Sequence, residues 1–258
     1  MTTSTERTTT ERRVSSRGHE IAYDVSGSGS PVVLVPGFLM GRVRWTETGT
    51  VAALAERHQV VSVDPLGFGD SSRPHDPSQY DAAGLAADLV AVLDAEGIES
   101  AHLWGYSRGT GLVADVACLH PGRVRSLVVG GAPIHVPRSA LPPNPDFVAA
   151  LRSGDWERAW ALFGIPLPDD VKTTMEARND PAAAAAAHAG LVQDVDRSRI
   201  DCPVMEYVGG GEWFWEVVRD EAEANGARLE VIGDLGHAET FQATGIVVPL
   251  VEDFLASV

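Results

Sequence analysis

The chain has 258 residues, of which 44% are hydrophobic and 22% charged, which is typical of a folded protein with a sizeable core and excludes fibrous, collagen-like and largely disordered chains. Its formal net charge of −16 at pH 7 excludes binding to nucleic acid, because the phosphate backbone would be repelled. Two cysteines are too few for a disulfide-rich scaffold or a four-ligand zinc pattern. The chemistry expected from the residues discussed below requires no metal or cofactor.

The amino-terminal segment resembles neither a signal peptide nor a membrane anchor. Residues 1–13 are rich in Thr, Ser, Glu and Arg and predict a disordered tail. No apolar run approaches the roughly 20 residues that a membrane-spanning helix needs. We therefore expect a cytoplasmic protein, a monomer or homodimer, that acts on a small hydrophobic molecule and not on a membrane.

Strand-like and helix-like segments alternate along most of the chain. Residues 11–16 and 20–26 predict a leading antiparallel hairpin. Short apolar runs then predict strands that are buried on both faces, at residues 32–35, 59–64, 101–106, 125–130, 204–209 and 228–233. Helical patterns cover residues 80–96, 111–120 and 213–225. Connections this short predict an α/β fold with a mostly parallel sheet and helices on both faces.

One region, residues 133–201, interrupts the alternation. It contains a proline cluster and then helical patterns over residues 147–163 and 169–191, with no convincing strand. We predict a helical cap here, inserted into an α/β core formed by residues 14–132 and 202–258. Trp156 and Trp160 share one face of a predicted helix, which either packs on the core or lines a substrate cleft.

The pentapeptide Gly105-Tyr106-Ser107-Arg108-Gly109 carries the strongest chemical signal. It is a G-x-S-x-G motif that follows a predicted strand and opens a predicted helix, the context that a nucleophile elbow requires. Such a turn projects the serine hydroxyl outward, and the glycines leave room for the neighbouring backbone. A serine hydroxyl needs a base within hydrogen-bond reach, and His237, directly after the last predicted strand, is the best-placed histidine.

Several landmarks in the same order make the chain resemble the α/β-hydrolase family from about residue 20 to the end. They are the strand and loop Val32–Phe38, the turn Asp64-Pro65-Leu66-Gly67-Phe68-Gly69-Asp70-Ser71, the elbow at Ser107, the segment His120-Pro121-Gly122-Arg123-Val124, and Gly236-His237 before a final helix. The resemblance implies an oxyanion hole formed by the backbone N–H groups of Phe38 and Arg108. Many members have His-Gly where this chain has Pro36-Gly37, which removes a side chain that supports that loop.

The third member of the expected triad departs from the family pattern. The family usually has an aspartate three residues beyond a glycine after the strand that precedes the histidine strand. This chain has Glu212 at that position, and a glutamate also satisfies the electrostatic requirement. The alternative is that Glu212 only favours the dipole in the first turn of the following helix.

The remaining candidates concern the substrate pocket. Met40, Tyr106 and Trp213 join the two cap tryptophans as predicted lining residues. Arg108 either meets an anionic group of the substrate or forms a structural ion pair in this acidic protein. Asp64 is expected to hold the turn after its strand rather than to take part in chemistry.

The function expected from these residues is serine-dependent hydrolysis of an ester, lactone or similar acyl bond, as in carboxylesterases and lactonases. The serine argues against the epoxide hydrolases and haloalkane dehalogenases of the same family, which use an aspartate nucleophile. Hydrolysis of a C–C bond and perhydrolysis remain open. So does a non-hydrolytic role. The missing aspartate favours a ligand-binding protein, and the altered oxyanion loop allows a cyclase or lyase.

Overall fold

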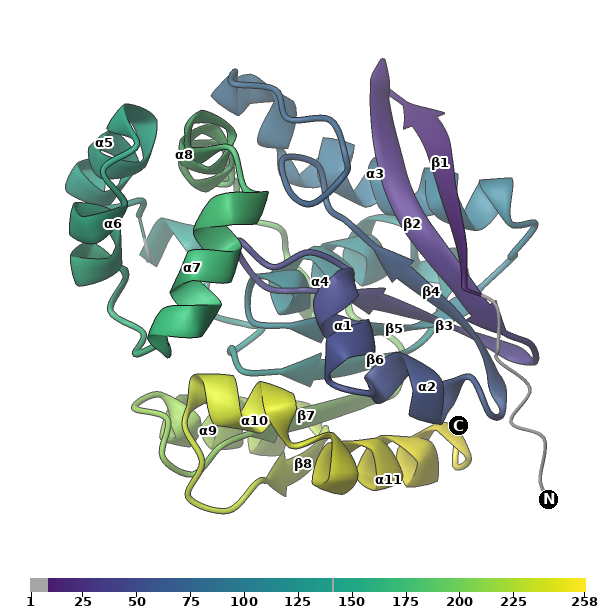
Figure 1. The fold of residues 1–258 in the computed structure, drawn as a ribbon. Helices are drawn as coiled ribbons and strands as arrows, with labels where there is room; N and C mark the ends of the chain where they lie inside the picture. Colours follow the sequence, from purple (N-terminus) through teal and green to yellow (C-terminus); the bar gives the residue numbers. More distant parts are fainter. Residues whose placement is uncertain (1–8, 141) are drawn as a thin grey trace, which may run out of the picture.

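The computed structural model describes residues 9–140 and 142–258, in which eight strands form a single sheet (Figure 1). Their spatial order is β1-β2-β4-β3-β5-β6-β7-β8. The strands are β1 (Thr10–Ser16), β2 (His19–Gly27), β3 (Ser30–Val35), β4 (His58–Val63), β5 (Ala101–Tyr106), β6 (Val124–Gly130), β7 (Val204–Val208) and β8 (Arg228–Val231). The order matches the predicted alternation, and each predicted strand is present to within two residues at either end.

The sheet is antiparallel at one edge and parallel elsewhere. The hairpin β1–β2 pairs antiparallel with β4, and every pair from β4 to β8 is parallel. The predicted disordered tail is too long, because residues 10–13 pair with Ala22–Val25 as the first part of β1. Its charged, exposed side chains are typical of a strand at the edge of a sheet. Residues 1–8 of the predicted tail lie outside the described residues.

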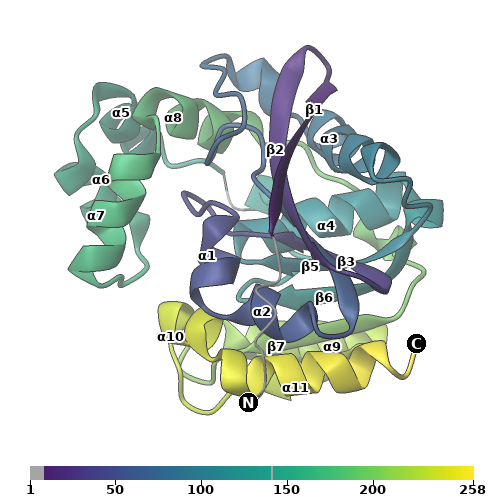
Figure 2. The same ribbon diagram turned by 45° about the vertical axis from the view of Figure 1, so that its right-hand side comes forward.

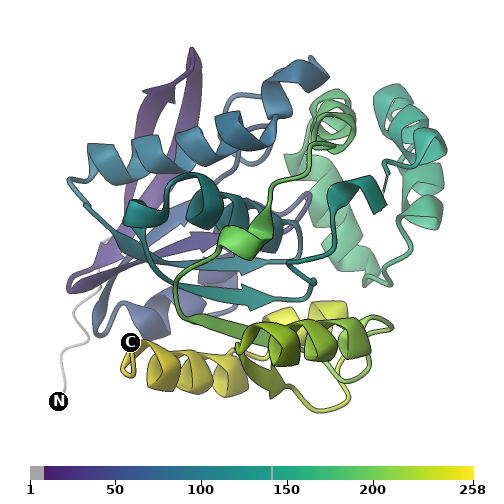
Figure 3. The same cartoon turned by 180° about the vertical axis from the view of Figure 1, so that it is seen from behind.

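Helices cover both faces of the sheet, as predicted. One face carries α3 (Ala82–Ala95), α4 (Arg108–Leu119) and α9 (Trp215–Asn225), which stand before the sheet in Figure 3. The other carries α1 (Val43–Glu47), α2 (Thr50–Leu54), α10 (His237–Gln242) and α11 (Thr244–Leu255). None of the helices in the described part of the chain is long and apolar enough to cross a bilayer.

Helix α3 shows how local sequence sets these boundaries. Asp81 caps its first turn by accepting a hydrogen bond from the Gly84 N–H at 2.9 Å. Leu85, Leu89 and Leu93 lie on its buried face. The chain leaves the helix at Gly97, which adopts a φ of 65° that other residues disfavour.

Between β6 and β7 the described residues form helices and no strand. Here α5 (Pro145–Ser153), α6 (Trp156–Phe163), α7 (Asp169–Arg178) and α8 (Pro181–Gly190) gather beyond one end of the sheet (Figures 1 and 2). Each of the two helical patterns predicted in this region is split in two. The first is broken at Gly154, with a φ of 74°, and the second at Asp180, which Pro181 forces out of the helical conformation.

Candidate active site

The turn around Ser107 is strained and tightly packed. Ser107 has φ 55° and ψ −120°, values that cost a non-glycine residue about 1–3 kcal/mol. A side chain at Gly105 would collide with the backbone of Gly109, and one at Gly109 would collide with the Val35 carbonyl. Only glycines therefore permit this approach of β3, β5 and α4. Strain held in place by packing in this way is typical of a functional site.

His237 and Glu212 come together at the same end of the sheet. Glu212 follows β7 and His237 follows β8, and the ring Nδ1 lies 2.9 Å from Glu212 Oε1. The Glu212 side chain is buried, since the residue is 6% exposed. Helix α9 begins at Trp215, so Glu212 lies before the helix rather than in its first turn. The contact with His237 favours the interpretation of Glu212 as the acid that orients the imidazole.

Tyr106 supports the histidine from behind instead of lining the pocket. It is fully buried, its hydroxyl donates to the His237 carbonyl at 2.6 Å, and the two rings are 5.1 Å apart. The prediction that Tyr106 contacts substrate is therefore wrong. As a residue on a central strand, its side chain had to point to one of the two helical layers.

Ser107 and His237 line one cavity of about 360 Å³. Its walls come from the elbow, from the loop after β6, from the helical insertion and from the Trp213–Phe214 segment. Within the described residues, the Ser107 hydroxyl makes no hydrogen bond with the imidazole. Catalytic hydrogen bonds often tighten only when substrate is bound, so the shared cavity is the relevant observation.

The loop after β3 lies beside the nucleophile. A Cβ at Gly37 would be 3.2 Å from the Ser107 Cβ. In the described structure the Phe38 N–H donates no hydrogen bond to the protein, and Leu39 is held at a φ of 61°. The Arg108 N–H opens α4, where helix geometry leaves it without an intrahelical acceptor. Both N–H groups are therefore available to an oxyanion.

Of the other predicted pocket residues, only Trp213 lines the cavity that contains Ser107. Met40 packs between the two main core clusters, and Trp156 stacks on Trp160 at 5.7 Å within the insertion. None of these three lines the cavity around Ser107. The Met40 sulfur nevertheless lies beside Gly37, on the same side of that glycine as the Ser107 Cβ. Contact of these three side chains with substrate stays a prediction. All three are half-buried and pack against the core. Trp213 does line the cavity, and it also borders a second cavity of about 620 Å³ that contains His237.

Three features of the site were not predicted. Asn179, from the turn between α7 and α8, donates to the Leu39 carbonyl at 2.9 Å and so holds the loop that carries Phe38. Arg138 and Arg197 line the cavity and share the buried Asp115. These contacts join segments far apart in sequence, and no local motif marks them.

Arg108 forms no salt bridge with any described carboxylate. Its Nη2 donates to the Ala187 carbonyl at 2.6 Å, and its guanidinium lies 5.4 Å from the centre of the Phe38 ring. The interpretation as a structural ion pair is therefore wrong. Asp64, by contrast, holds its turn as expected, because its carboxylate accepts from the Asp70 N–H at 2.9 Å. No group of three or more metal-ligating side chains gathers within residues 9–140 and 142–258.

Comparison with known proteins agrees with this architecture. A family model for the alpha/beta hydrolase fold matches residues 30–199. The 2-hydroxymuconate semialdehyde hydrolase of Pseudomonas sp. strain CF600 is 30% identical, over 90% of this chain and 88% of that protein. The 2-hydroxymuconate semialdehyde hydrolase of Pseudomonas putida is 32% identical, over 95% and 94%. An epoxide hydrolase structure from an endophytic Streptomyces superposes with a TM-score of 0.78 at 20% identity, over 96% of this chain and 95% of that one.

The structural likeness at such low identity shows the fold alone, whereas the family model and the two relatives that match over most of their length show the family. The relatives are hydrolases, and a strained serine and a histidine–carboxylate pair meet here at one cavity. The chain is therefore a hydrolase that belongs to the α/β-hydrolase fold family.

Proposed function

We propose that this protein is a serine-dependent hydrolase of an ester, lactone or similar acyl bond in a small substrate. The observation that carries the proposal is the 2.9 Å contact between His237 and Glu212 beside a cavity that also contains Ser107. A carboxylate on Nδ1 leaves Nε2 as the ring nitrogen that can accept the serine proton.

The reaction proceeds in two halves. The Ser107 hydroxyl adds to the carbonyl carbon while its proton passes to His237, and the Phe38 and Arg108 N–H groups hold the resulting oxyanion. Collapse breaks the bond to the leaving alcohol, which takes the proton from His237, and an acyl-enzyme remains. Water then adds to this ester with His237 as base, and the acid product leaves Ser107 free.

A second candidate is hydrolysis of a C–C bond by the same residues. It is favoured by the two Pseudomonas relatives named as 2-hydroxymuconate semialdehyde hydrolases, because the alignments cover 88% and 94% of their lengths. Measuring kcat/KM for a panel of esters, lactones and 2-hydroxymuconate semialdehyde would rank the two reactions. The ligand-binding alternative depended on the missing aspartate, and the position of Glu212 weakens it.

The test is the turnover of 4-nitrophenyl butyrate by three variants. Ser107→Ala is expected to lower kcat by about 10⁴-fold or more, and Glu212→Gln by about 10²–10⁴-fold, because the amide cannot stabilise the imidazolium. Glu216→Gln changes an exposed glutamate four residues further on and is the matched control, with kcat unchanged. Melting temperatures verify that each variant is folded. Unchanged kcat in Ser107→Ala would overturn the proposal.

A further inference from the structure

The cavity around Ser107 is lined by arginines and by no acidic side chain. Arg108, Arg138 and Arg197 contribute to its wall, and none of the lining residues is an aspartate or glutamate. This concentration of positive charge contrasts with the formal net charge of −16 of the whole chain. His188 also lines the cavity, but burial and the nearby Arg108 lower its pKa to about 4, so it is neutral at pH 7.

Two of the three guanidinium groups are already used by the protein. Arg197 lies 3.1 Å from the fully buried Asp115, and Arg138 pairs with the same carboxylate. Both also donate to backbone carbonyls, Arg197 to Gly111 at 3.1 Å and Arg138 to Gln193 at 2.9 Å. Two cations that share one anion leave the cavity wall positive even before Arg108 is considered.

Arg108 has N–H donors that no protein acceptor uses in the described residues. Its Nη2 reaches the Ala187 carbonyl, whereas its Nε and Nη1 donate to no acceptor in the described residues. Burial, together with Arg138, lowers the pKa of Arg108 to about 10, so the side chain still carries its charge at pH 7. Arg108 is half-buried at the cavity wall, so its free donors face the space that a ligand would occupy. A partly desolvated cation without a carboxylate partner is a candidate group for binding an anion.

We propose that the substrate carries a carboxylate, which the guanidinium of Arg108 binds while Ser107 attacks the acyl carbon. This inference deepens the proposed function, on which its catalytic half rests. A carboxylate fits because a single unpaired guanidinium offers one positive charge and because N–H donors to a carboxylate form strong, charge-assisted hydrogen bonds. The place of Arg108 next to the nucleophile in sequence implies a short substrate, such as a half-ester of a dicarboxylic acid.

The kinetic test uses two substrates that differ by one charge, mono-4-nitrophenyl glutarate and its methyl ester. The wild type is expected to favour the acid in kcat/KM, and Arg108→Gln to lose about 10–100-fold more on the acid than on the methyl ester, chiefly through KM. Arg108→Lys should recover part of the preference, because it restores the charge. Arg125→Gln, an exposed arginine at the opposite end of β6, is the matched control. Equal losses on both substrates in Arg108→Gln would show that Arg108 only tethers α8, and would overturn the inference.

A binding measurement separates this inference from the proposed reaction. Isothermal titration calorimetry with glutarate is expected to show binding to Ser107→Ala and at least about tenfold weaker binding to the Ser107→Ala/Arg108→Gln double variant. If neither ester is hydrolysed but this difference holds, the proposed function fails and the carboxylate site stands. If the esters are hydrolysed and glutarate binding does not depend on Arg108, the carboxylate site fails.

Discussion

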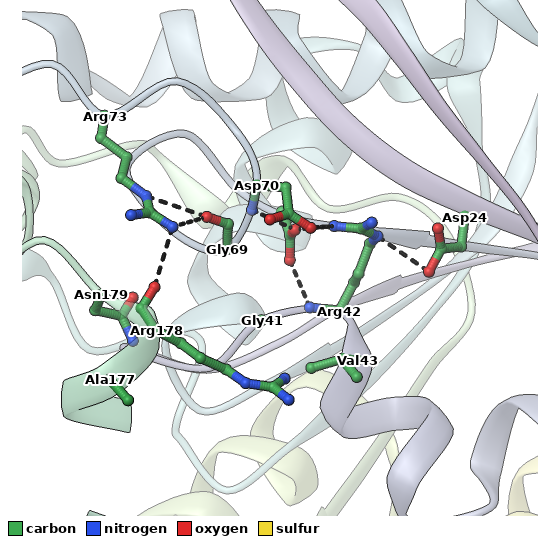
Figure 4. Close-up of a pocket in the computed structure, with 11 residues that line it drawn as sticks. Asp24, Gly41, Arg42, Val43, Gly69, Asp70, Arg73, Ala177, Arg178 and Asn179 are labelled. Carbon is green, nitrogen blue, oxygen red and sulfur yellow. Dashed lines mark hydrogen bonds and ion pairs between the residues drawn. The ribbon is translucent and has the colours of Figure 1, made fainter. Parts of the chain in front are cut away.

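Two neighbouring regions at the carboxyl ends of the strands each contain an arginine, and the two arginines differ in their partners. Figure 4 shows Arg42, which is 6% exposed, between acidic side chains in a polar cavity of about 500 Å³. It lies 3.0 Å from Asp24 and 2.9 Å from Asp70, and it also pairs with the buried Asp64. In the cavity around Ser107, Arg108 has no such partner among the described residues.

The difference distinguishes a structural cation from one available to a ligand. A buried charge that is matched on several sides stabilises the native state only as long as every partner is present. An unmatched one contributes nothing comparable to stability and retains its attraction for an anion. We therefore expect the arginine of the first region to matter for folding and that of the second for substrate.

The largest expected effect is a loss of stability when Arg42, the arginine with acidic partners, is replaced. Arg42→Met leaves Asp64 with its desolvation cost and without its cation, so the free energy of unfolding should fall by about 3–5 kcal/mol. Urea denaturation followed by tryptophan fluorescence measures this change. Arg57→Met, at a mostly exposed arginine near Glu252, is the control and should change stability by less than about 0.5 kcal/mol. A similarly small loss in Arg42→Met would remove the distinction between the regions.

Glu206, outside the candidate site, is a buried carboxyl group without a cationic or hydrogen-bonding partner in the described residues. It is 1% exposed, neither carboxylate oxygen has a hydrogen-bond partner in the described structure, and burial together with the nearby Glu221 raises its pKa from 4.5 to about 8. The native state therefore holds a proton that the unfolded state releases between about pH 4.5 and 8. Below that range Glu206 is protonated in both states and its titration does not lower stability. As the pH rises through the range, the free energy of unfolding falls by up to about 1.4 kcal/mol per pH unit.

Glu206→Gln removes this titration while keeping the shape of the side chain. The variant should lose less stability than the wild type between pH 5 and pH 8, so that the difference in the free energy of unfolding grows with pH in favour of the variant. Denaturation midpoints at several pH values measure it. Parallel pH profiles for the two proteins would mean that Glu206 does not titrate in this range.

Asn179 connects the two regions and gives a smaller effect. It lines the polar cavity of Arg42 and donates to the Leu39 carbonyl beside Phe38. Asn179→Ala is expected to lower kcat by about tenfold, since a displaced Phe38 N–H no longer meets the oxyanion, and to cost about 1–2 kcal/mol of stability. Stopped-flow turnover and thermal melts give the two values. A stability loss with kcat intact would make Asn179 purely structural.

The smallest expected change is in the stability of Arg108→Met. Because Arg108 lacks a carboxylate, its replacement should alter the free energy of unfolding by no more than about 1 kcal/mol in either direction. The same urea experiment that tests Arg42 measures it. A loss as large as that in Arg42→Met would mean that Arg108 is as structural as its neighbour.

The fold was largely predictable because local sequence patterns indicate most of its strands and helices. Short apolar runs with β-branched residues identify β3 to β8, and Gly97 and Pro121 end the helices before them. The short helices α1 and α2 were missed, since five residues are too few to show a helical period. The splits at Gly154 and Asp180 were also missed, although each has a local cause in a left-handed glycine and in a proline.

The residues of the site were predictable only where a motif with fixed spacing identifies them. The elbow, the place of His237 after the last strand and the position of Glu212 relative to the glycine after β7 identified three residues that lie together. Ser107 and His237 line one cavity, and Glu212 contacts His237. The lining of the pocket was not predictable, because contacts such as Arg108 with Ala187 or Asn179 with Leu39 join segments 79 and 140 residues apart. Tyr106 was misplaced because one residue on a buried strand gives no sign of which face it occupies.

Covalent labelling of the nucleophile tests the central claim most directly. The protein is treated with a fluorophosphonate, and intact mass followed by peptide mapping locates the adduct. We expect one adduct per chain on Ser107, none in Ser107→Ala, and labelling slowed by orders of magnitude in His237→Ala. A folded wild-type protein that remains unlabelled, or an adduct on another residue, would contradict the assignment of Ser107 as an activated nucleophile.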